Sequence, residues 1–211
     1  MTFGCVNRFS KVADESLGLW ASLLKRIPDS KLLLKSGDAN DRELRGHHIV
    51  ERLSDLGVSS NRVILLGRTS QYEHLNTYNQ VDISLDTLPF AGGITTLESL
   101  CMGSPVVTLT DDSKITHRTS SAILSPLGLD EWVAETKDEY IEIVCNWVRN
   151  LGELAELRQE LRDRVLAQAS KFVPQVETAY REMWSRWCRE EKLSPIYTNL
   201  YDSPSVNRKF N

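Results

Sequence analysis

The chain has 211 residues, of which 41% are hydrophobic and 26% charged, a composition typical of a soluble globular protein. Its net charge is −4, and no long basic run interrupts the mixture of acidic and basic residues, which argues against nucleic acid as a partner. The sequence has neither an apolar leader nor a run of about 18 apolar residues, so we expect no membrane partner and a cytoplasmic location.

Four cysteines are spread widely along the chain, at Cys5, Cys101, Cys145 and Cys188. None belongs to a C-x-x-C pair, and no histidine cluster lies beside them, so neither a disulfide framework nor a zinc site is indicated. We expect reduced, mostly buried thiols and no metal site.

Apolar runs alternate with helical patterns along the first half of the chain. We expect strands in 2–6, 31–36, 62–67, 82–86 and 105–109, and helices or short helical turns in 13–30, 41–57, 70–81 and 93–102. Gly57 and Gly103 follow two of these helices, where a left-handed residue commonly ends a helix. Strands that alternate with helices at short spacing predict an α/β fold with a doubly wound parallel sheet.

The second half of the chain reads as mostly helical. We expect a short helix in 114–129, an edge strand or turn at 131–134, and helices at 137–150, 151–168 and 173–190. A stripe of apolar residues in the helix expected at 151–168 predicts packing on the flank of the sheet: Leu151, Leu154, Leu157, Leu161 and Val165. We expect residues 1–189 to form one domain and residues 190–211 a flexible tail.

The most informative stretch is residues 82–107, "DISLDTLPFAGGITTLESLCMGSPVV". Gly92 and Gly93 remove side chains where a strand runs through a loop into a helix, and a helix start presents unpaired N–H groups and a positive dipole end. Hydroxyls of Thr95 and Thr96 add donors for phosphate oxygens. The loop is therefore predicted to hold a phosphate, although a capping box and a tight turn would use the same residues.

One turn further into this helix, Glu98 shares a face with Thr95, while Ile94, Leu97 and Cys101 are expected to face the core. A carboxylate there cannot hold phosphate, but it can accept hydrogen bonds from two ribose hydroxyls. A nucleoside diphosphate fits both the predicted phosphate-binding loop and the predicted ribose-binding carboxylate. The motifs G-x-G-x-x-G and G-x-x-x-x-G-K-[ST] are absent, which disfavours dinucleotide oxidoreductases and P-loop NTPases.

Three segments together resemble a known family: "FGCVNRFSKV", the stretch from "VILLGRTSQYEHL" to "GSPVVTL", and "AYREMWSRW". They are similar to the C-terminal catalytic lobe of the protein O-GlcNAc transferases and their SPINDLY-like relatives, over residues 2 to 189. The resemblance implies a Rossmann-like lobe of a GT-B glycosyltransferase that holds the sugar nucleotide without a metal or other cofactor.

The resemblance also implies roles for single residues. Lys11 matches a lysine that contacts the donor diphosphate and is the candidate catalytic residue; His74 matches a histidine near the base and ribose. Thr95 matches a threonine at the diphosphate and Glu98 a ribose-binding acid. Gly92, Gly93 and Thr96 complete the expected nucleotide-sugar site. Gly93 stands where animal relatives carry histidine, which leaves more of the binding to backbone N–H groups.

The resemblance implies an inverting transfer from a UDP-sugar, with UDP-N-acetylglucosamine the leading donor, to Ser or Thr of a protein acceptor. GDP-fucose, used by the SPINDLY-like branch, stays open as the donor. The family's N-terminal lobe and repeat domain have no counterpart in these residues, so that lobe is a further expected partner. The alternative is a non-catalytic nucleotide-sugar-binding or protein-interaction module derived from such an enzyme. An epimerase is disfavoured, because no Tyr-x-x-x-Lys pair is present.

Overall fold

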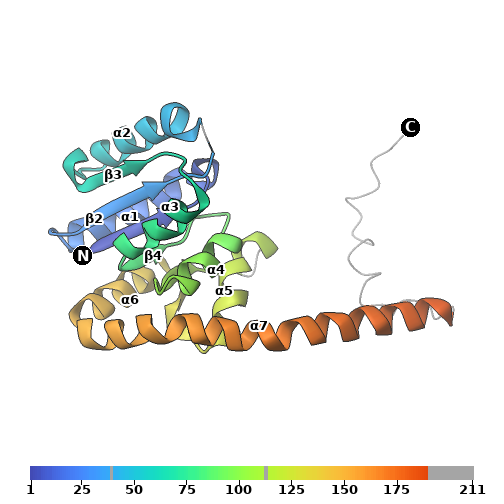
Figure 1. The fold of residues 1–211 in the computed structure, drawn as a ribbon. Coiled ribbons are helices and arrows are strands. Elements are labelled where there is room, and N and C mark those ends of the chain that lie inside the picture. The colour runs from blue at the N-terminus through green and yellow to red at the C-terminus, as the bar shows by residue number, and fades with distance from the viewer. Residues whose placement is uncertain (39, 112–113, 190–211) are drawn as a thin grey trace, which may run out of the picture. The chain divides into compact units, whose positions relative to one another are not determined.

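The computed structural model describes residues 1–38, 40–111 and 114–189 (Figure 1). The chain divides into two compact units, residues 1–168 and residues 169–211, and a long helix crosses the boundary between them. Most of the second unit's described residues belong to that helix. Residues 190–211, which we expected to form a flexible tail, lie outside the described part of the chain.

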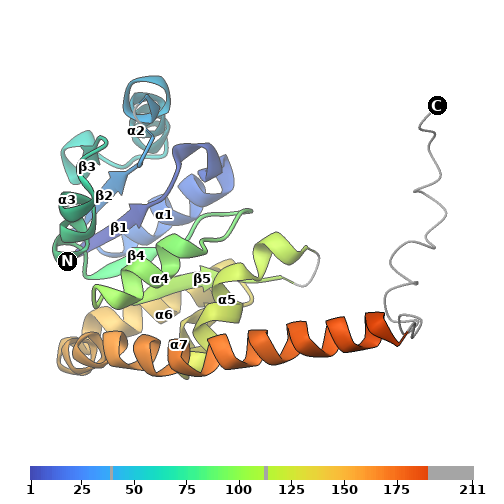
Figure 2. The same ribbon diagram turned by 45° about the vertical axis from the view of Figure 1, so that its right-hand side comes forward.

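A six-stranded parallel sheet forms the centre of the first unit (Figures 1 and 2). Its strands are β1 (Thr2–Val6), β2 (Lys31–Lys35), β3 (Val63–Leu66), β4 (Ile83–Leu85), β5 (Val106–Leu109) and β6 (Val133–Ala134). They lie in the order β3-β2-β1-β4-β5-β6, and each neighbouring pair is parallel. The direction of winding reverses between β1 and β4, the place where open sheets of this kind bind ligands.

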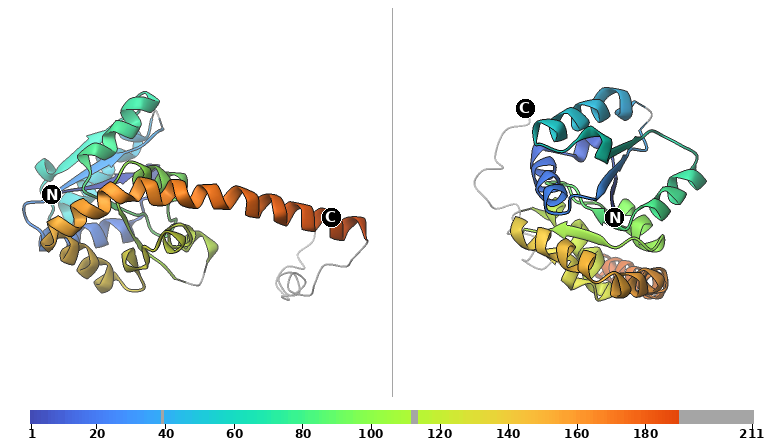
Figure 3. Two further views of the ribbon diagram at one scale, coloured as in Figure 1. Left: turned by 60° about the horizontal axis from the view of Figure 1, so that its bottom comes forward. Right: turned by 90° about the vertical axis from the view of Figure 1, so that its left-hand side faces the viewer.

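Seven α-helices connect and extend these strands within the described residues: α1 (Asp14–Arg26), α2 (His47–Asp55), α3 (Gln71–Asn76), α4 (Ile94–Cys101), α5 (Thr119–Leu124), α6 (Lys137–Arg149) and α7 (Leu151–Cys188). Helix α1 packs beside α2 and α6. In the right-hand view of Figure 3, α1 (blue) and α6 (gold) lie on one side of the sheet and α3 (green) on the other. The prediction of a doubly wound parallel sheet is confirmed.

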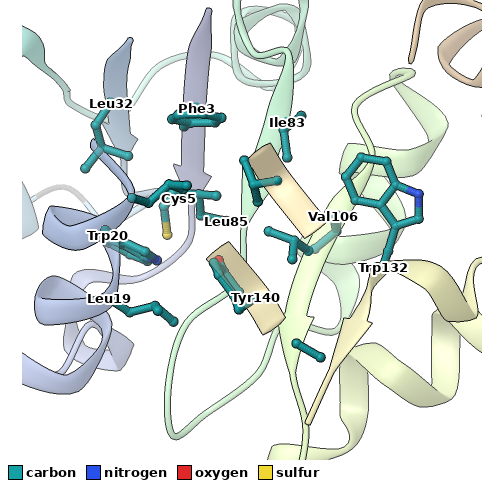
Figure 4. Packing of buried hydrophobic residues seen from close by; sticks show 14 of the residues in the cluster. Phe3, Cys5, Leu19, Trp20, Leu32, Ile83, Leu85, Val106, Trp132 and Tyr140 are labelled. Atoms are coloured by element: carbon teal, nitrogen blue, oxygen red, sulfur yellow. The ribbon is translucent and has the colours of Figure 1, made fainter. Parts of the chain in front are cut away.

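The core lies between the sheet and the helices that cover it (Figure 4). Trp20 of α1 and Tyr140 of α6 are fully buried and lie close to Cys5 of β1 and Leu85 of β4. Large aromatic side chains bury the most apolar area per residue, so this contact supplies much of the stability of the unit. The contact lies near the carboxyl ends of β1 and β4, because Cys5 and Leu85 are at or next to the last residues of those strands.

Both glycines expected to end a helix have positive φ angles, +83° at Gly57 and +77° at Gly103, as left-handed helix ends require. Among the cysteines, Cys5 and Cys145 are buried, Cys101 is partly buried and Cys188 is exposed. Within the described residues, no helix combines the length and the apolar character needed to cross a bilayer.

The expectation of two separate helices after residue 150 is wrong, because α7 is continuous through Pro174. A proline inside a helix has no N–H to donate, yet good helix formers on both sides carry α7 past it. Of the predicted stripe, Leu154, Leu157, Leu161 and Val165 are buried, whereas Leu151 at the first position of the helix is 58% exposed.

Candidate functional site

Two loops meet at the carboxyl ends of β1 and β4, where the winding of the sheet reverses. After β1, a 3₁₀ turn (Phe9–Lys11) carries Lys11, and after β4 the chain forms the Gly92–Gly93 loop. The Lys11 ammonium donates a hydrogen bond to the Ala91 carbonyl oxygen at 3.2 Å. The fold thus places Lys11 against the glycine loop, although the two are 80 residues apart in sequence.

The turn that carries Lys11 is held by Asp41, a buried carboxylate from the loop after β2. The Phe9 N–H donates to Asp41 Oδ2 at 3.0 Å, the Ser36 hydroxyl donates to the same oxygen, and Arg45 donates to Oδ1 at 2.9 Å. Burial raises the pKa of the Asp41 carboxyl, but hydrogen bonds from Ser36 and Phe9 and the charge of Arg45 outweigh burial and hold it below the ordinary value. Asp41 is therefore a charged anchor for this turn.

Gly92 is required by close packing inside the loop. A Cβ atom at this position would lie 2.3 Å from Thr96 Oγ1 and 3.2 Å from both Asp86 Oδ1 and Thr95 Oγ1. The Gly92 N–H donates to Asp86 Oδ1 at 2.7 Å and so points into the protein. Gly93, which precedes α4, has room for a Cβ atom, which would make an ordinary van der Waals contact of 3.7 Å with Thr119 Cγ2.

The first turn of α4 differs from the expected orientation. Ile94 is 77% exposed and Leu97 is 39% exposed, so the expectation that they face the core is wrong, whereas Cys101 packs partly against the core. Thr96 is buried and its hydroxyl hydrogen-bonds the Ser120 hydroxyl at 3.0 Å. Thr95 is only partly buried, so of the two threonines it is the one nearer the surface of this edge.

Glu98 and His74 meet across α4 and α3. Their Oε2 and Nε2 atoms are 3.3 Å apart, and both side chains are about one-fifth exposed. The buried Tyr78 hydroxyl lies 3.5 Å from the same Glu98 oxygen and donates to the Thr95 carbonyl oxygen at 3.3 Å. Burial raises the pKa of Tyr78 well above its ordinary value, so the phenol stays neutral and acts as a donor.

Sequence reasoning assigned no role to three of these anchoring residues: Asp41, Tyr78 and Asp86. Asp86 directly follows a buried strand. That position could have indicated a role in the site, because polar residues there reach the carboxyl edge of a sheet. Asp41 and Tyr78 act through partners distant in sequence, such as Phe9 and Glu98. Their part in the site becomes visible only once the strands are placed side by side.

The site can bind an extended anionic ligand with a polar group at each end. Lys11 and the start of α4 supply positive charge and donors at one end, while the carboxylate of Glu98 and the imidazole of His74 supply a hydrogen-bonding pair at the other. Within the described residues, no three histidine, cysteine, aspartate or glutamate side chains converge as metal ligands would.

Comparison with known proteins gives a consistent result. The family model described as glycosyl transferase family 41 matches residues 1–177. The chain is 32% identical to the "Probable UDP-N-acetylglucosamine--peptide N-acetylglucosaminyltransferase SPINDLY" of Arabidopsis thaliana, over 99% of this chain and 24% of that protein. It is 27% identical to the "UDP-N-acetylglucosamine--peptide N-acetylglucosaminyltransferase" of Caenorhabditis elegans, over 94% of this chain and 17% of that protein. The chain therefore spans a quarter or less of the length of these relatives.

Solved structures agree with the sequence comparisons. A mutant of the O-GlcNAc transferase of Thermobaculum terrenum superposes with a TM-score of 0.82 at 37% identity, over 90% of this chain and 37% of that chain. The C-terminal domain of the group 1 glycosyl transferase LpcC of Francisella tularensis is similar in fold alone, with a TM-score of 0.58 at 14% identity, over 80% of this chain and 85% of that domain. The predicted GT-B lobe and the predicted family are confirmed, and the chain belongs to glycosyl transferase family 41.

Proposed function

We propose that this chain is the donor-binding lobe of an inverting protein O-glycosyltransferase, which transfers a sugar from a UDP-sugar to Ser or Thr hydroxyls. The observation that carries the proposal is the meeting of Lys11, the start of α4 and the Glu98–His74 pair at one edge of the sheet. Membership of family 41 supports it, because the relatives' names specify a sugar nucleotide and a peptide acceptor.

Lys11 and the first turn of α4 are assigned to the diphosphate. The Lys11 ammonium compensates the charge that develops on the nucleotide as the bond between sugar and diphosphate breaks, so the site needs no metal ion for that purpose. The N-terminus of α4 adds the positive end of its dipole, and the partly buried Thr95 is assigned as a side-chain donor in its first turn. Lys11 is the candidate catalytic residue on this basis.

Glu98 and His74 are assigned to the nucleoside. The Glu98 carboxylate accepts hydrogen bonds from the two ribose hydroxyls, and His74 lies beside it where the ribose joins the base. The donor proposed is UDP-N-acetylglucosamine, which the names of the plant and nematode relatives include. GDP-fucose is the alternative donor, and a protein acceptor and the remaining lobe of the enzyme are the proposed partners.

The test is ligand-dependent melting of the purified chain with UDP, GDP and inorganic pyrophosphate. A ligand that binds only the folded state at about 100 times its Kd adds roughly 2.7 kcal/mol of stability, which is a readily measured rise in Tm. We expect UDP and pyrophosphate to raise the Tm, UDP more than GDP, and Lys11→Met to remove most of both shifts. Lys25→Met is the matched control, because this exposed lysine is in the last turn of α1, at the opposite end of the helix from the turn that carries Lys11.

No rise in Tm with UDP at millimolar concentration would overturn nucleotide binding by this lobe. A larger shift with GDP than with UDP would keep the lobe assignment but replace the donor with a GDP-sugar. The Lys25→Met chain must behave as the unmodified chain does, since otherwise a general loss of positive charge explains the result.

A second candidate function is a protein-interaction module derived from such an enzyme. Exposed aromatic side chains on the last part of α7 favour it, with Tyr180, Trp184 and Trp187 each at least 66% exposed. If UDP, GDP and pyrophosphate all leave the Tm unchanged while the chain self-associates through these side chains, this candidate replaces the first. Sedimentation of the unmodified chain and of Trp184→Ala separates the two.

A further inference from the structure

Asp86, at the carboxyl end of β4, carries a buried carboxyl group that the proposed function leaves unused. It is 5% exposed. Its Oδ1 atom accepts hydrogen bonds from the N–H groups of Thr87 at 2.9 Å and Gly92 at 2.7 Å, and its Oδ2 atom accepts one from the Thr108 hydroxyl at 2.7 Å. Burial raises the pKa of Asp86 above its ordinary value, and the hydrogen bonds from Ser120, Thr108, Gly92 and Thr87 offset only part of that rise. The geometry favours the ionised form against this rise, because the hydrogen bonds on both carboxyl oxygens come from donor groups.

A carboxylate beneath a site for a diphosphate would repel the ligand, so its presence calls for an explanation. The peptide group between Ala91 and Gly92 offers one, because it connects Asp86 to Lys11. The N–H of Gly92 donates to Asp86, and the carbonyl oxygen of Ala91, which belongs to the same peptide group, accepts from the Lys11 ammonium at 3.2 Å. The C=O and N–H of a planar trans peptide point in opposite directions. The Ala91–Gly92 peptide therefore lies between the carboxylate on its inner side and the ammonium on its outer side.

We propose that Asp86 is a positioning residue for Lys11 and acts through the Ala91–Gly92 peptide. The inference rests on the proposed function, because it takes Lys11 as the group that contacts the donor diphosphate. Asp86 orients the peptide and polarises it, so that the Ala91 carbonyl is a stronger acceptor and holds the ammonium at the loop before a ligand arrives. Hydrogen bonds in such a chain strengthen one another in a low-dielectric interior.

The Cys5 thiol lies near both Asp86 and Lys11. Burial raises the pKa of this thiol, the charge of Asp86 raises it further, and the charge of Lys11 lowers it. Cys5 lies on β1, one residue before its end, so both charges act on the same end of the same strand. Asp86 and Lys11 therefore lie near the same end of β1, where the Ala91–Gly92 peptide joins them.

The experiment measures pyrophosphate affinity by calorimetry for the unmodified chain, Asp86→Asn, Lys11→Met and the double variant. Asparagine keeps the volume of Asp86 and an oxygen that accepts from Gly92, but it removes the charge. We expect Asp86→Asn to weaken pyrophosphate about tenfold in the unmodified background and less than about twofold once Lys11 is methionine, as a coupled pair requires. Asp55→Asn, the same chemical change at an exposed position on α2, is the control and should change nothing.

The sign of the effect separates positioning from simple repulsion. If Asp86 were only a nearby negative charge, Asp86→Asn would tighten pyrophosphate, and that result would overturn the inference. Equal weakening with and without Lys11 would also overturn it, since Asp86 would then act on the fold as a whole. If the unmodified chain binds neither UDP nor pyrophosphate, the proposed function fails instead.

A second measurement decides the matter where Asp86→Asn does not fold or no ligand binds. In ¹H–¹⁵N spectra of the ligand-free chain, Lys11→Met should shift the Gly92 amide resonance more than the Gly93 amide resonance, because Lys11 polarises the peptide that carries the Gly92 N–H. An unchanged Gly92 resonance would contradict the link between Asp86 and Lys11.

Discussion

The Lys11 half of the candidate site and the Glu98 half differ in how firmly their polar groups are held. In the loop that meets Lys11, Asp86 accepts hydrogen bonds of 2.7 Å from Gly92 and Thr108, and the Lys11 ammonium adds one of 3.2 Å to the Ala91 carbonyl oxygen. Around Glu98, the contacts to His74 and Tyr78 are longer, 3.3 and 3.5 Å. Shorter hydrogen bonds to buried charges are the stronger ones. The half assigned to the diphosphate is thus organised in advance, whereas the half assigned to the ribose has weakly held groups that can exchange partners.

This difference suits the two proposed tasks, binding of the diphosphate by the Lys11 half and binding of the ribose by the Glu98 half. Charge that develops on a leaving diphosphate is best stabilised by groups that need not move during the reaction. A carboxylate that must accept two ribose hydroxyls has to release part of its existing bonding, and the long contacts from His74 and Tyr78 make that exchange inexpensive in free energy. The predictions below test the rigid half first and the adaptable half last.

Gly92→Ala should have the largest effect on stability, because the added side chain would clash inside the loop that meets Lys11. The added Cβ would lie 2.3 Å from Thr96 Oγ1 and 3.2 Å from Asp86 Oδ1, and both of those side chains are buried. Overpacking of this kind costs about 1 to 3 kcal/mol of stability. Urea unfolding measures the loss.

The control for this prediction is Gly93→Ala, one residue along the same loop. An added Cβ there would meet its nearest atom at 3.7 Å, so we expect little loss of stability. Equal destabilisation by the two substitutions would show that the loop tolerates neither side chain for reasons unrelated to Asp86.

Asp41→Asn should have an intermediate, pH-dependent effect on the turn that carries Lys11. The folded-state pKa of Asp41 lies below its ordinary value of about 3.9, so its stabilisation is present above that value and is lost as the pH falls through the folded-state pKa. We expect the substitution to cost about 1 to 2 kcal/mol at pH 7 and progressively less below about pH 4. Urea unfolding of both chains between pH 3 and pH 7 measures this.

Asp55→Asn provides the matched control, since Asp55 is an exposed carboxylate on α2 whose side chain is 69% exposed. It should leave the stability nearly unchanged at every pH. A difference between Asp41→Asn and the unmodified chain that stays constant down to pH 3 would contradict the charged anchor.

Tyr78→Phe should have the smallest effect, because the bonds of this hydroxyl are long. Removing the hydroxyl leaves the buried ring in place and deletes the contacts to Glu98 and to the Thr95 carbonyl. We expect UDP to bind a few-fold more weakly and pyrophosphate to be unaffected, a loss of roughly 0.5 to 1 kcal/mol. Tyr72→Phe is the control, because Tyr72 is on α3, directly before the 3₁₀ turn (Thr77–Gln80) that carries Tyr78, and is 80% exposed. A large loss for pyrophosphate would mean that the two halves are not separate.

The sheet was predictable because its strands are short apolar runs between clear helix signals. Gly57 and Gly103 marked two helix ends correctly, and both have the positive φ that such ends need. The α4 prediction failed at Ile94 and Leu97, because spacing alone cannot tell which face of a short helix meets the core. The expected break between residues 168 and 173 was wrong, since α7 has strong helix formers on both sides of Pro174 and continues through it.

The candidate site was only partly predictable for a related reason. Lys11, Thr95 and Glu98 could be named from the sequence because they match a family pattern. The role of Asp86 depends on Thr108 and on the Ala91–Gly92 peptide, and that of Asp41 depends on the Phe9 N–H. These contacts join different loops at one edge of the sheet, so no local pattern in the sequence encodes them.

Calorimetric titration of the unmodified chain and of Glu98→Ala with UDP and with pyrophosphate tests the central claim most directly, namely that the edge of the sheet holds a diphosphate and a ribose in separate halves. The account predicts that Glu98→Ala weakens UDP about tenfold, roughly 1.4 kcal/mol, and leaves pyrophosphate affinity unchanged. Equal losses for the two ligands, or no loss for UDP, would contradict it.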